Sequence, residues 1–481
     1  MRMRRLAGAA ALLCAAAGAP AASAAEEPIT SPNVTHVKNI PYAAKNGTIP
    51  NYGTDIEFAQ LGGRQYALAG SYRNGLQIVD VTTPQSASVA SVYDCGVTQG
   101  DVQVFRQADL PGRTFVTYTS DTYGDGTSTC YREAEALGFD VRKSDGTGRN
   151  GTFIAEITDP LAPVTISFVE FPQGSHNMTV HPGGEWLYNS NSDLITSTQP
   201  AIEYTDISDP AHPGATRELA LPTRPGLGTE SHDITFNEDG SRAYSAALSQ
   251  GVIIDTTDPG APELVTSFLN PAINVWHQAD PFTLTDASGT EREYLVVEDE
   301  FAGASGTGQC PNGGVWFYEV TGALERNPAL VGYYNIDDAR PTTTADGTCT
   351  AHVFDVHEAE QVMTIAWYNG GTRVLDLSGL TGITIGGTQI SGDGVKEIGS
   401  ARFPGSDTWS AKTPAIDPSG DFYLFANDMA RGMDIWSFDG AGATPAAKGR
   451  WMGGAEAQAY FAQRREALPA GYALRCLPAS Q

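Results

Sequence analysis

Short apolar runs recur along the chain, each ending in an acidic residue and a polar turn. β-branched and aromatic residues fill the runs, and Thr, Ser, Asp, Pro and Gly fill the turns. Copies of this element occupy 76–84, 153–160, 203–210, 252–259, 316–322 and 374–379, and a more divergent copy occupies 434–440. Each copy is typical of a β-strand that ends in a turn. We expect the acid to accept backbone N–H bonds in that turn and to have a structural role.

A second apolar run precedes each copy. These runs occupy 65–69, 114–118, 186–189, 242–246, 293–297, 362–366 and 422–426. A further strand comes before the second run and another follows the acidic turn, so each unit has four short antiparallel strands. One such sheet cannot bury both of its apolar faces, but a ring of them can. The pattern predicts an all-β protein, a seven-bladed β-propeller of four-stranded antiparallel blades.

The repeat also resembles that of a known family. The segment Leu76-Gln77-Ile78-Val79-Asp80 matches, with one change, the pentapeptide that gives LVIVD-repeat proteins their name. The resemblance spans roughly Thr54 to Gly440 and implies an exported bacterial β-propeller protein. It specifies architecture and says little about chemistry, because propellers carry many unrelated activities.

The ends of the chain differ from the repeats. Three arginines, an apolar run at 6–17 and the small residues Ala22-Ser23-Ala24 form the pattern of a secretory signal peptide. We therefore expect a signal peptide at 1–24, an N-terminal segment at 25–53 whose part 33–40 could add a ring-closing strand, the propeller at 54–454, and a C-terminal helical segment at 455–481. Beyond the signal, no apolar stretch is long enough to predict membrane insertion. The expected location is extracellular.

Charge and cysteines agree with export. The chain has 56 acidic and 29 basic residues, a formal charge of −27, which disfavours nucleic acid as a partner. Cys14 lies in the signal, and the five remaining cysteines would enter an oxidising compartment. We expect two bridges, Cys95 to Cys130 and Cys310 to Cys349, with Cys476 either free or paired between chains.

Histidines recur at one position of the repeat. The innermost strands of four consecutive blades are expected to begin at His176, His232, His277 and His352. The other three blades have Asp55, Asp101 and Lys412 there. Because innermost strands line the axis, these side chains could converge on one funnel. Four imidazoles suit copper, iron or zinc, and nearby acids could orient their N–H groups: Glu230, Glu298, Glu300 and Glu358. His181 and His357 are expected in turns or on the surface.

Two classes of function remain open. Some propeller oxygenases, notably the carotenoid-cleaving family, hold iron with four histidines from different blades, and the likeness is one of geometry alone. One hypothesis is thus a histidine-lined axial site for a metal or a small ligand, which in an enzyme would serve a metal-dependent oxidase or oxygenase. The other is a scaffold that binds an extracellular protein or glycan, whose histidines brace neighbouring blades without metal. No nucleophile elbow, phosphate-binding loop or His-Glu-x-x-His motif is present, which disfavours hydrolase and nucleotide chemistry.

Overall fold

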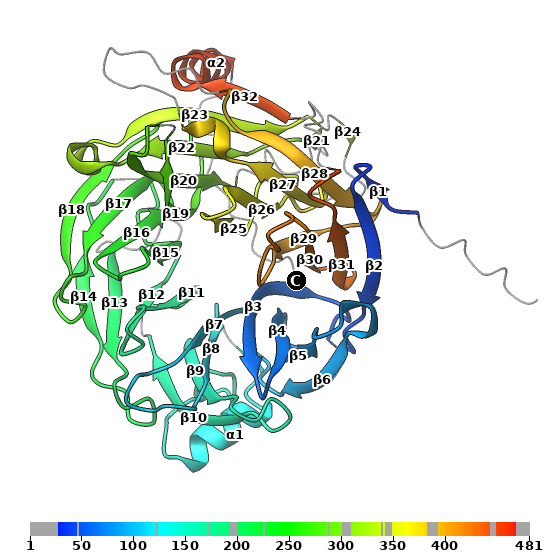
Figure 1. The fold of residues 1–481 in the computed structure, drawn as a ribbon. Helices are drawn as coiled ribbons and strands as arrows, with labels where there is room; N and C mark the ends of the chain where they lie inside the picture. Colours follow the sequence, from blue (N-terminus) through cyan, green and yellow to red (C-terminus); the bar gives the residue numbers. More distant parts are fainter. Residues whose placement is uncertain are drawn as a thin grey trace, which may run out of the picture.

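The described strands form a closed ring of sheets around a central axis (Figure 1). The computed structural model describes residues 27–467, apart from 46–47, 122–123, 172, 193–199, 225–226, 287, 301–308, 338–339, 342–348, 382–392 and 443–448. Within these residues there are seven blades, each with a core of four antiparallel strands, so the predicted fold is confirmed. The expected signal peptide and Cys476 lie outside the described residues. In the described part of the chain, no helix is long and apolar enough to cross a bilayer.

Each blade is a meander that runs outward from the axis. Blade one contains β3 (Gly53–Leu61), β4 (Arg64–Ser71), β5 (Leu76–Asp80) and β6 (Ser88–Tyr93). Blade two contains β7 (Gln99–Phe105), β8 (Phe115–Ser120), β9 (Gly151–Glu156) and β10 (Val164–Glu170). Blade three contains β11 (Asn177–Val180), β12 (Trp186–Ser190), β13 (Ala201–Asp206) and β14 (Arg217–Ala220). Blade four contains β15 (Asp233–Phe236), β16 (Arg242–Ala247), β17 (Gln250–Asp255) and β18 (Glu263–Phe268).

Blades five and six have a fifth strand, and blade seven takes its fourth strand from the N-terminal segment. Blade five contains β19 (Trp276–Thr285), β20 (Glu291–Asp299), β22 (Val315–Glu319), β23 (Ala329–Ile336) and β32 (Gly449–Gly453). Blade six contains β25 (Phe354–His357), β26 (Val362–Ala366), β27 (Thr372–Asp376), β28 (Lys396–Arg402) and β1 (Ile29–Thr30). Blade seven contains β29 (Thr408–Lys412), β30 (Phe422–Asp428), β31 (Gly432–Phe438) and β2 (Val34–Ile40). A separate pair consists of β21 (Gln309–Cys310) and β24 (Arg340–Pro341).

The acids of the repeat hold the turns that follow them. The Oδ1 of Asp80 accepts the backbone N–H of Thr82 at 3.1 Å, and Asp255 does the same for Thr257 at 3.0 Å. Asp206 and Asp376 accept N–H bonds at 2.9 and 2.8 Å from the residue two positions further on. The structural role expected for these carboxylates is confirmed.

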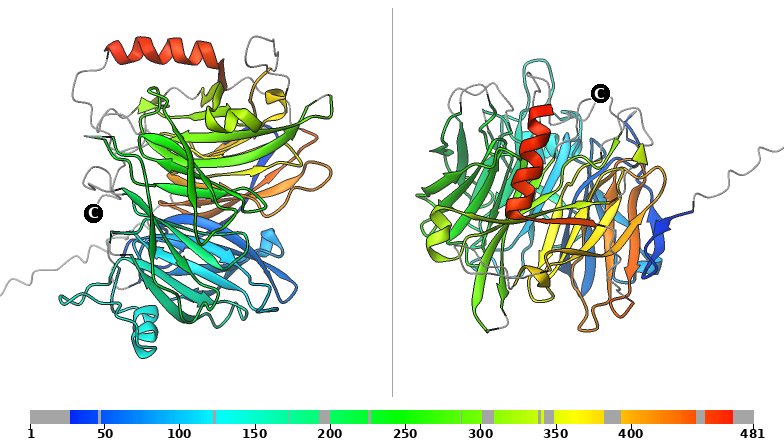
Figure 2. Two further views of the ribbon diagram at one scale, coloured as in Figure 1. Left: turned by 90° about the vertical axis from the view of Figure 1, so that its left-hand side faces the viewer. Right: turned by 90° about the horizontal axis from the view of Figure 1, so that it is seen from above.

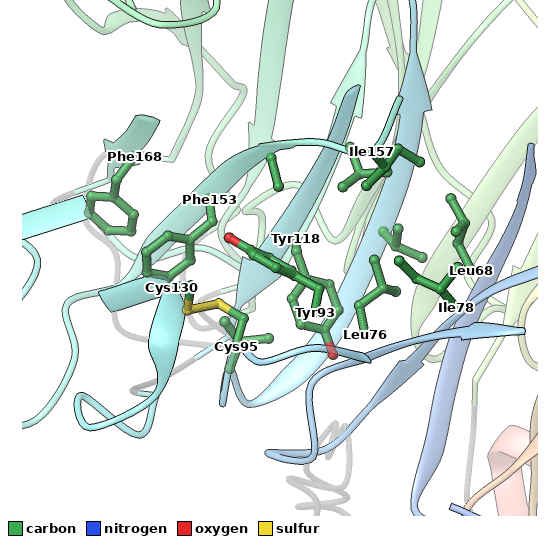
Figure 3. Close-up of a cluster of buried hydrophobic side chains, with 14 of the residues drawn as sticks. Leu68, Leu76, Ile78, Tyr93, Cys95, Tyr118, Cys130, Phe153, Ile157 and Phe168 are labelled. Carbon is green, nitrogen blue, oxygen red and sulfur yellow. A yellow bond between two sulfur atoms is a disulfide. The ribbon is translucent and has the colours of Figure 1, made fainter. Parts of the chain in front are cut away.

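Apolar side chains between adjacent blades form the core. Between blades one and two, Leu68, Ile78, Tyr118 and Phe153 are all fully buried (Figure 3). Burying each such side chain contributes roughly 1.5–3 kcal/mol. The Cys95–Cys130 disulfide joins this cluster to α1 (Thr129–Ala136), which lies in the long insertion of blade two. The second bridge joins Cys310 to Cys349, so both predicted disulfides are confirmed.

The N-terminal segment closes the ring. Strand β2 pairs antiparallel with β31 and becomes the outermost strand of blade seven, where the expected closing strand would lie (Figure 1). Asn427 of β30 joins blade seven to blade one, because its side-chain amide donates to the carbonyls of Thr54, Asp55 and Gly70 at 2.9–3.1 Å. Its Oδ1 accepts the hydroxyl of Tyr42 at 2.8 Å. Closure therefore combines strand pairing with a buried polar contact.

The C-terminal helix lies outside the ring. Strand β32 adds to the outer edge of blade five and leads into α2 (Gly454–Ala467), which crosses that edge (Figure 2). Phe461 packs on Trp316 and Tyr333 with ring centroids 5.0 Å apart in both cases. The helix thereby adds to the apolar cluster on one face of the outer strands of blade five.

Candidate functional site

The four histidines of the repeat lie side by side at the entry of the innermost strands of blades three to six. Their rings form an arc with centroid separations of 4.3, 4.1 and 4.4 Å, in the order His176, His232, His277 and His352. The last three are buried, with 1%, 3% and 1% of their surface exposed. Residues more than 170 positions apart in the chain therefore share one environment, as the repeat alignment predicts.

An oxygen atom contacts the Nδ1 of every ring in the arc. His232 Nδ1 lies 3.1 Å from the carbonyl oxygen of His277, and His352 Nδ1 lies 2.6 Å from that of Trp409. A carbonyl oxygen can only accept, so both rings carry their proton on Nδ1 and keep a lone pair on Nε2. His277 Nδ1 lies 2.5 Å from Glu298, and His176 Nδ1 lies 3.1 Å from Asp121. Such contacts fix the orientation of metal-binding imidazoles.

Glu300 brings a carboxylate to the free nitrogens. Its oxygens lie 3.8 Å from His277 Nε2 and 3.6 Å from His352 Nε2, which is too long for hydrogen bonds. Ligand atoms of His232, His277 and Glu300 all lie within 4.8 Å of one another. Two imidazoles and a carboxylate are a donor set that zinc and iron accept.

This group differs from the ligand set expected from the repeat. We expected Glu300 to orient a histidine, but the structure places its carboxylate among the nitrogens. His352 borders the group through Glu300, whereas the Nε2 of His176 lies 3.1 Å from the side-chain nitrogen of Gln99. Glu298 and Glu300 are two positions apart in an extended segment, so both face the same side. The spacing of two residues was the sequence signal that could have placed Glu300 beside Glu298, facing the histidines.

Tyr368 positions Glu300 from blade six. Its hydroxyl donates to Glu300 Oε1 at 2.7 Å, and its ring lies 4.4 Å from that of His352. The backbone of Tyr368 is left-handed, with φ 44°, in the turn between β26 and β27. Such a conformation is costly for an aromatic residue and is often found at functional sites. Nothing in the repeat pattern indicated this residue.

Burial keeps three of the histidines neutral. It lowers the pKa of His232 and His277 well below the ordinary value of 6.5 and that of His352 to about 3. Neighbouring imidazoles lower these values further. Burial also raises the pKa of Glu298 well above its usual range, and the charge of Glu300 adds to that effect. Neutral imidazoles with free lone pairs are the form that binds metal.

A cavity of about 180 Å³ adjoins the arc. His277 and His352 line it, and so do the three residues expected in the funnel: Asp55, Asp101 and Lys412. The ammonium of Lys412 lies 3.2 Å from Asp55 and 2.7 Å from Glu57. The funnel is therefore a polar chamber that reaches the imidazoles.

The remaining candidates have other positions. His181 lies in a turn, where its Nε2 is 3.0 Å from the carbonyl of Gly240, and His357 is half-buried at the end of β25. Glu230 is buried and accepts the N–H of Ala201 at 3.1 Å. Glu358 is exposed in the turn after β25, so the expectation that it orients a histidine was wrong.

The fold and the site define the chain as a seven-bladed β-propeller with a histidine-lined axial cavity. Comparison with known proteins does not assign the chain to a more specific class. No family model and no curated protein matches the sequence. Among solved structures, the chain is similar to the β-propeller domain of Cps50 (Swd1) from Myceliophteria thermophila. The sequence identity is 11%, the TM-score is 0.47, and the match covers 84% of this chain and 99% of that one.

Proposed function

We propose that the protein is a secreted β-propeller of the LVIVD-repeat type that binds one divalent transition metal ion on its axis. His232, His277 and Glu300 would hold the metal, and His352 adjoins them. Iron, copper or zinc fits a site of imidazole and carboxylate without thiolate. The observation that carries the proposal is the gathering of these donor atoms within 4.8 Å. Carbonyl contacts at Nδ1 of His232 and His352 support it, because they leave the Nε2 of each ring as the atom that can bind metal.

Such a metal would supply Lewis-acid or redox chemistry to a small molecule in the adjoining cavity. The residues around it would bind and orient that molecule and exclude water. We therefore extend the proposal to a metal-dependent enzyme of the oxidase or oxygenase type. Two disulfides support secretion, because such bridges persist in oxidising compartments.

The second candidate is an extracellular scaffold that binds a protein or glycan and holds no metal. One observation favours it: His232 and His352 each contact a backbone carbonyl of the next blade, as bracing histidines would. Bracing through Nδ1 gives no reason for a buried carboxylate to gather near Nε2. We therefore prefer the metal site.

Metal content separates the two candidates. We would purify the wild type without a histidine tag and measure metal per chain by plasma mass spectrometry, beside His232→Ala/His277→Ala. His212→Ala is a matched control, because that imidazole is exposed in an outer turn. The proposal expects about one equivalent in the wild type and the control, and loss in the double variant at unchanged fold. Absence of metal in all three proteins after reconstitution with iron, copper and zinc would leave the scaffold.

A further inference from the structure

Carboxylates dominate the wall of the axial cavity. Six of them, contributed by blades one, two, four, five and six, line it: Asp55, Glu57, Asp101, Asp233, Asp280 and Asp355. Lys412 is the one lysine or arginine among the lining residues in the described chain. The chamber therefore has a strong excess of acidic groups.

The fold compensates only part of this charge. Lys412 forms ion pairs with Asp55 and Glu57. Asp101 accepts the N–H of Met178 at 2.8 Å, and Asp280 accepts the side chains of Thr235 and Gln278 at 2.7 and 3.0 Å. These donors are neutral. Among the described residues, no cationic side chain lies within 4 Å of either carboxylate.

The pKa values of Asp101 and Asp280 reflect the free-energy cost of burying these carboxylates. Burial raises the pKa of Asp280 to about 6, and it raises that of Asp101 well above the usual range. Buried carboxylates without a cation are costly. A positively charged ligand would relieve this cost.

The spread of the carboxylates indicates the kind of cation. A bare calcium ion needs six to eight oxygens around one point. In the described chain, however, the one group of three or more ligand atoms gathered within 4.8 Å is that of His232, His277 and Glu300. No three of the cavity carboxylates therefore gather around one point, and Asp101 and Asp280 belong to blades two and five. Its volume of about 180 Å³ has room for roughly ten water-sized groups. An extended ligand with separated positive charges fits better than a single ion.

The same cavity reaches the imidazoles. His277 and His352 are buried, line the chamber, and have Nε2 atoms too far from Glu300 for a hydrogen bond. A ligand held by the carboxylates would therefore lie against the histidine arc. The position of the two histidines is an observation separate from the acidic residues. It places a ligand in the cavity next to the candidate metal centre.

We infer that the axial cavity is a binding site for a small organic cation with two separated ammonium groups. Asp101 and Asp280 bind these groups, and the chain between them lies beside His277 and His352. As an assignment of substrate class, the inference rests on the proposed metal site. As a binding site it does not, because the carboxylates are present whether or not metal binds.

The test is titration calorimetry with 1,4-diaminobutane as the probe and 1,4-butanediol as its uncharged counterpart. We would compare the wild type with Asp101→Asn/Asp280→Asn, which keeps the shape of both side chains and one acceptor oxygen in each, enough for the bonds from Met178 and Thr235. Asp109→Asn is the control, because it removes the charge of an exposed carboxylate. Thermal melting checks that all three proteins are folded. We expect the diamine to bind the wild type and the control and to bind the double variant at least roughly tenfold more weakly.

Equal affinity of the folded double variant and the wild type would overturn the inference, and so would equal binding of the diol. Absence of diamine binding to the wild type would overturn it as well. Repeating the titration on chelator-treated protein separates the two proposals. Diamine binding without metal in any preparation would refute the metal site and keep the cation site. Bound metal without diamine binding would do the reverse.

Discussion

Because of Glu203, the free energy of unfolding should fall as the pH rises toward neutral. Glu203 lies in β13 with 3% of its surface exposed, and its carboxylate accepts the amide of Asn189 at 3.1 Å. Burial raises its pKa from 4.5 to about 7, the Asn189 bond opposes this, and the charges of Glu218 and Glu230 add to it. The native state therefore binds the proton more tightly than the unfolded chain.

The sign follows from proton linkage. Between the unfolded and folded pKa values the native state holds more protons, so stability falls as pH rises. The contribution of Glu203 is complete below about pH 4.5 and is lost as pH rises through about 7. A shift of about 2.5 units corresponds to about 3 kcal/mol.

Urea unfolding at pH 5 and pH 8 measures this effect. We expect Glu203→Gln to reduce the loss of unfolding free energy between these pH values by about 2.5 kcal/mol, because its neutral amide carries no burial penalty and part of the effect already lies below pH 5. Glu360→Gln is the control, since Glu360 is exposed in a turn of blade six and does not act on Glu203. If Glu203→Gln and the wild type lose the same free energy, the carboxylate is not perturbed as described.

Three further outcomes follow from the contacts of the ring and the site. Asn427→Ala should lower the unfolding free energy by about 2–4 kcal/mol, because it removes buried hydrogen bonds to the carbonyls of Asp55 and Gly70 and from Tyr42; a loss below 1 kcal/mol in urea would contradict this. Glu298→Ala should weaken metal binding by roughly 10–100-fold in chelator competition, because His277 loses the side-chain oxygen beside its Nδ1, and unchanged affinity would argue against that role. Cys95→Ala/Cys130→Ala should cost about 3–4 kcal/mol, since the bridge closes 35 residues of chain; an unchanged melting temperature would refute it.

The periodic features could be predicted from the sequence. Seven copies of a strand ending in an acidic turn specify the blades, because each copy alone leaves an apolar face unburied. The same alignment brings His176, His232, His277 and His352 to equivalent positions, and equivalent strand starts meet at the axis. Cysteine pairing followed from the placement of nearby loops on one fold.

Contacts made by residues that occur in only one blade could not be predicted from the repeat. Glu300 and Tyr368 come from turns of different blades, and their 2.7 Å contact depends on how those blades pack. The expectation for Glu358 failed because closeness in sequence to His352 does not place a residue at the same end of a strand: five residues of extended chain carry it to the opposite turn.

The sequence by itself determined the ring, the order of its blades and the four imidazoles on its axis, because a repeat transfers local information from one copy to the next. Only the tertiary structure decided which donors meet. The grouping of His232, His277 and Glu300, and the carboxylates facing one chamber from five blades, depend on side-chain directions around a closed ring. Those directions are set by packing between blades, which local patterns do not encode.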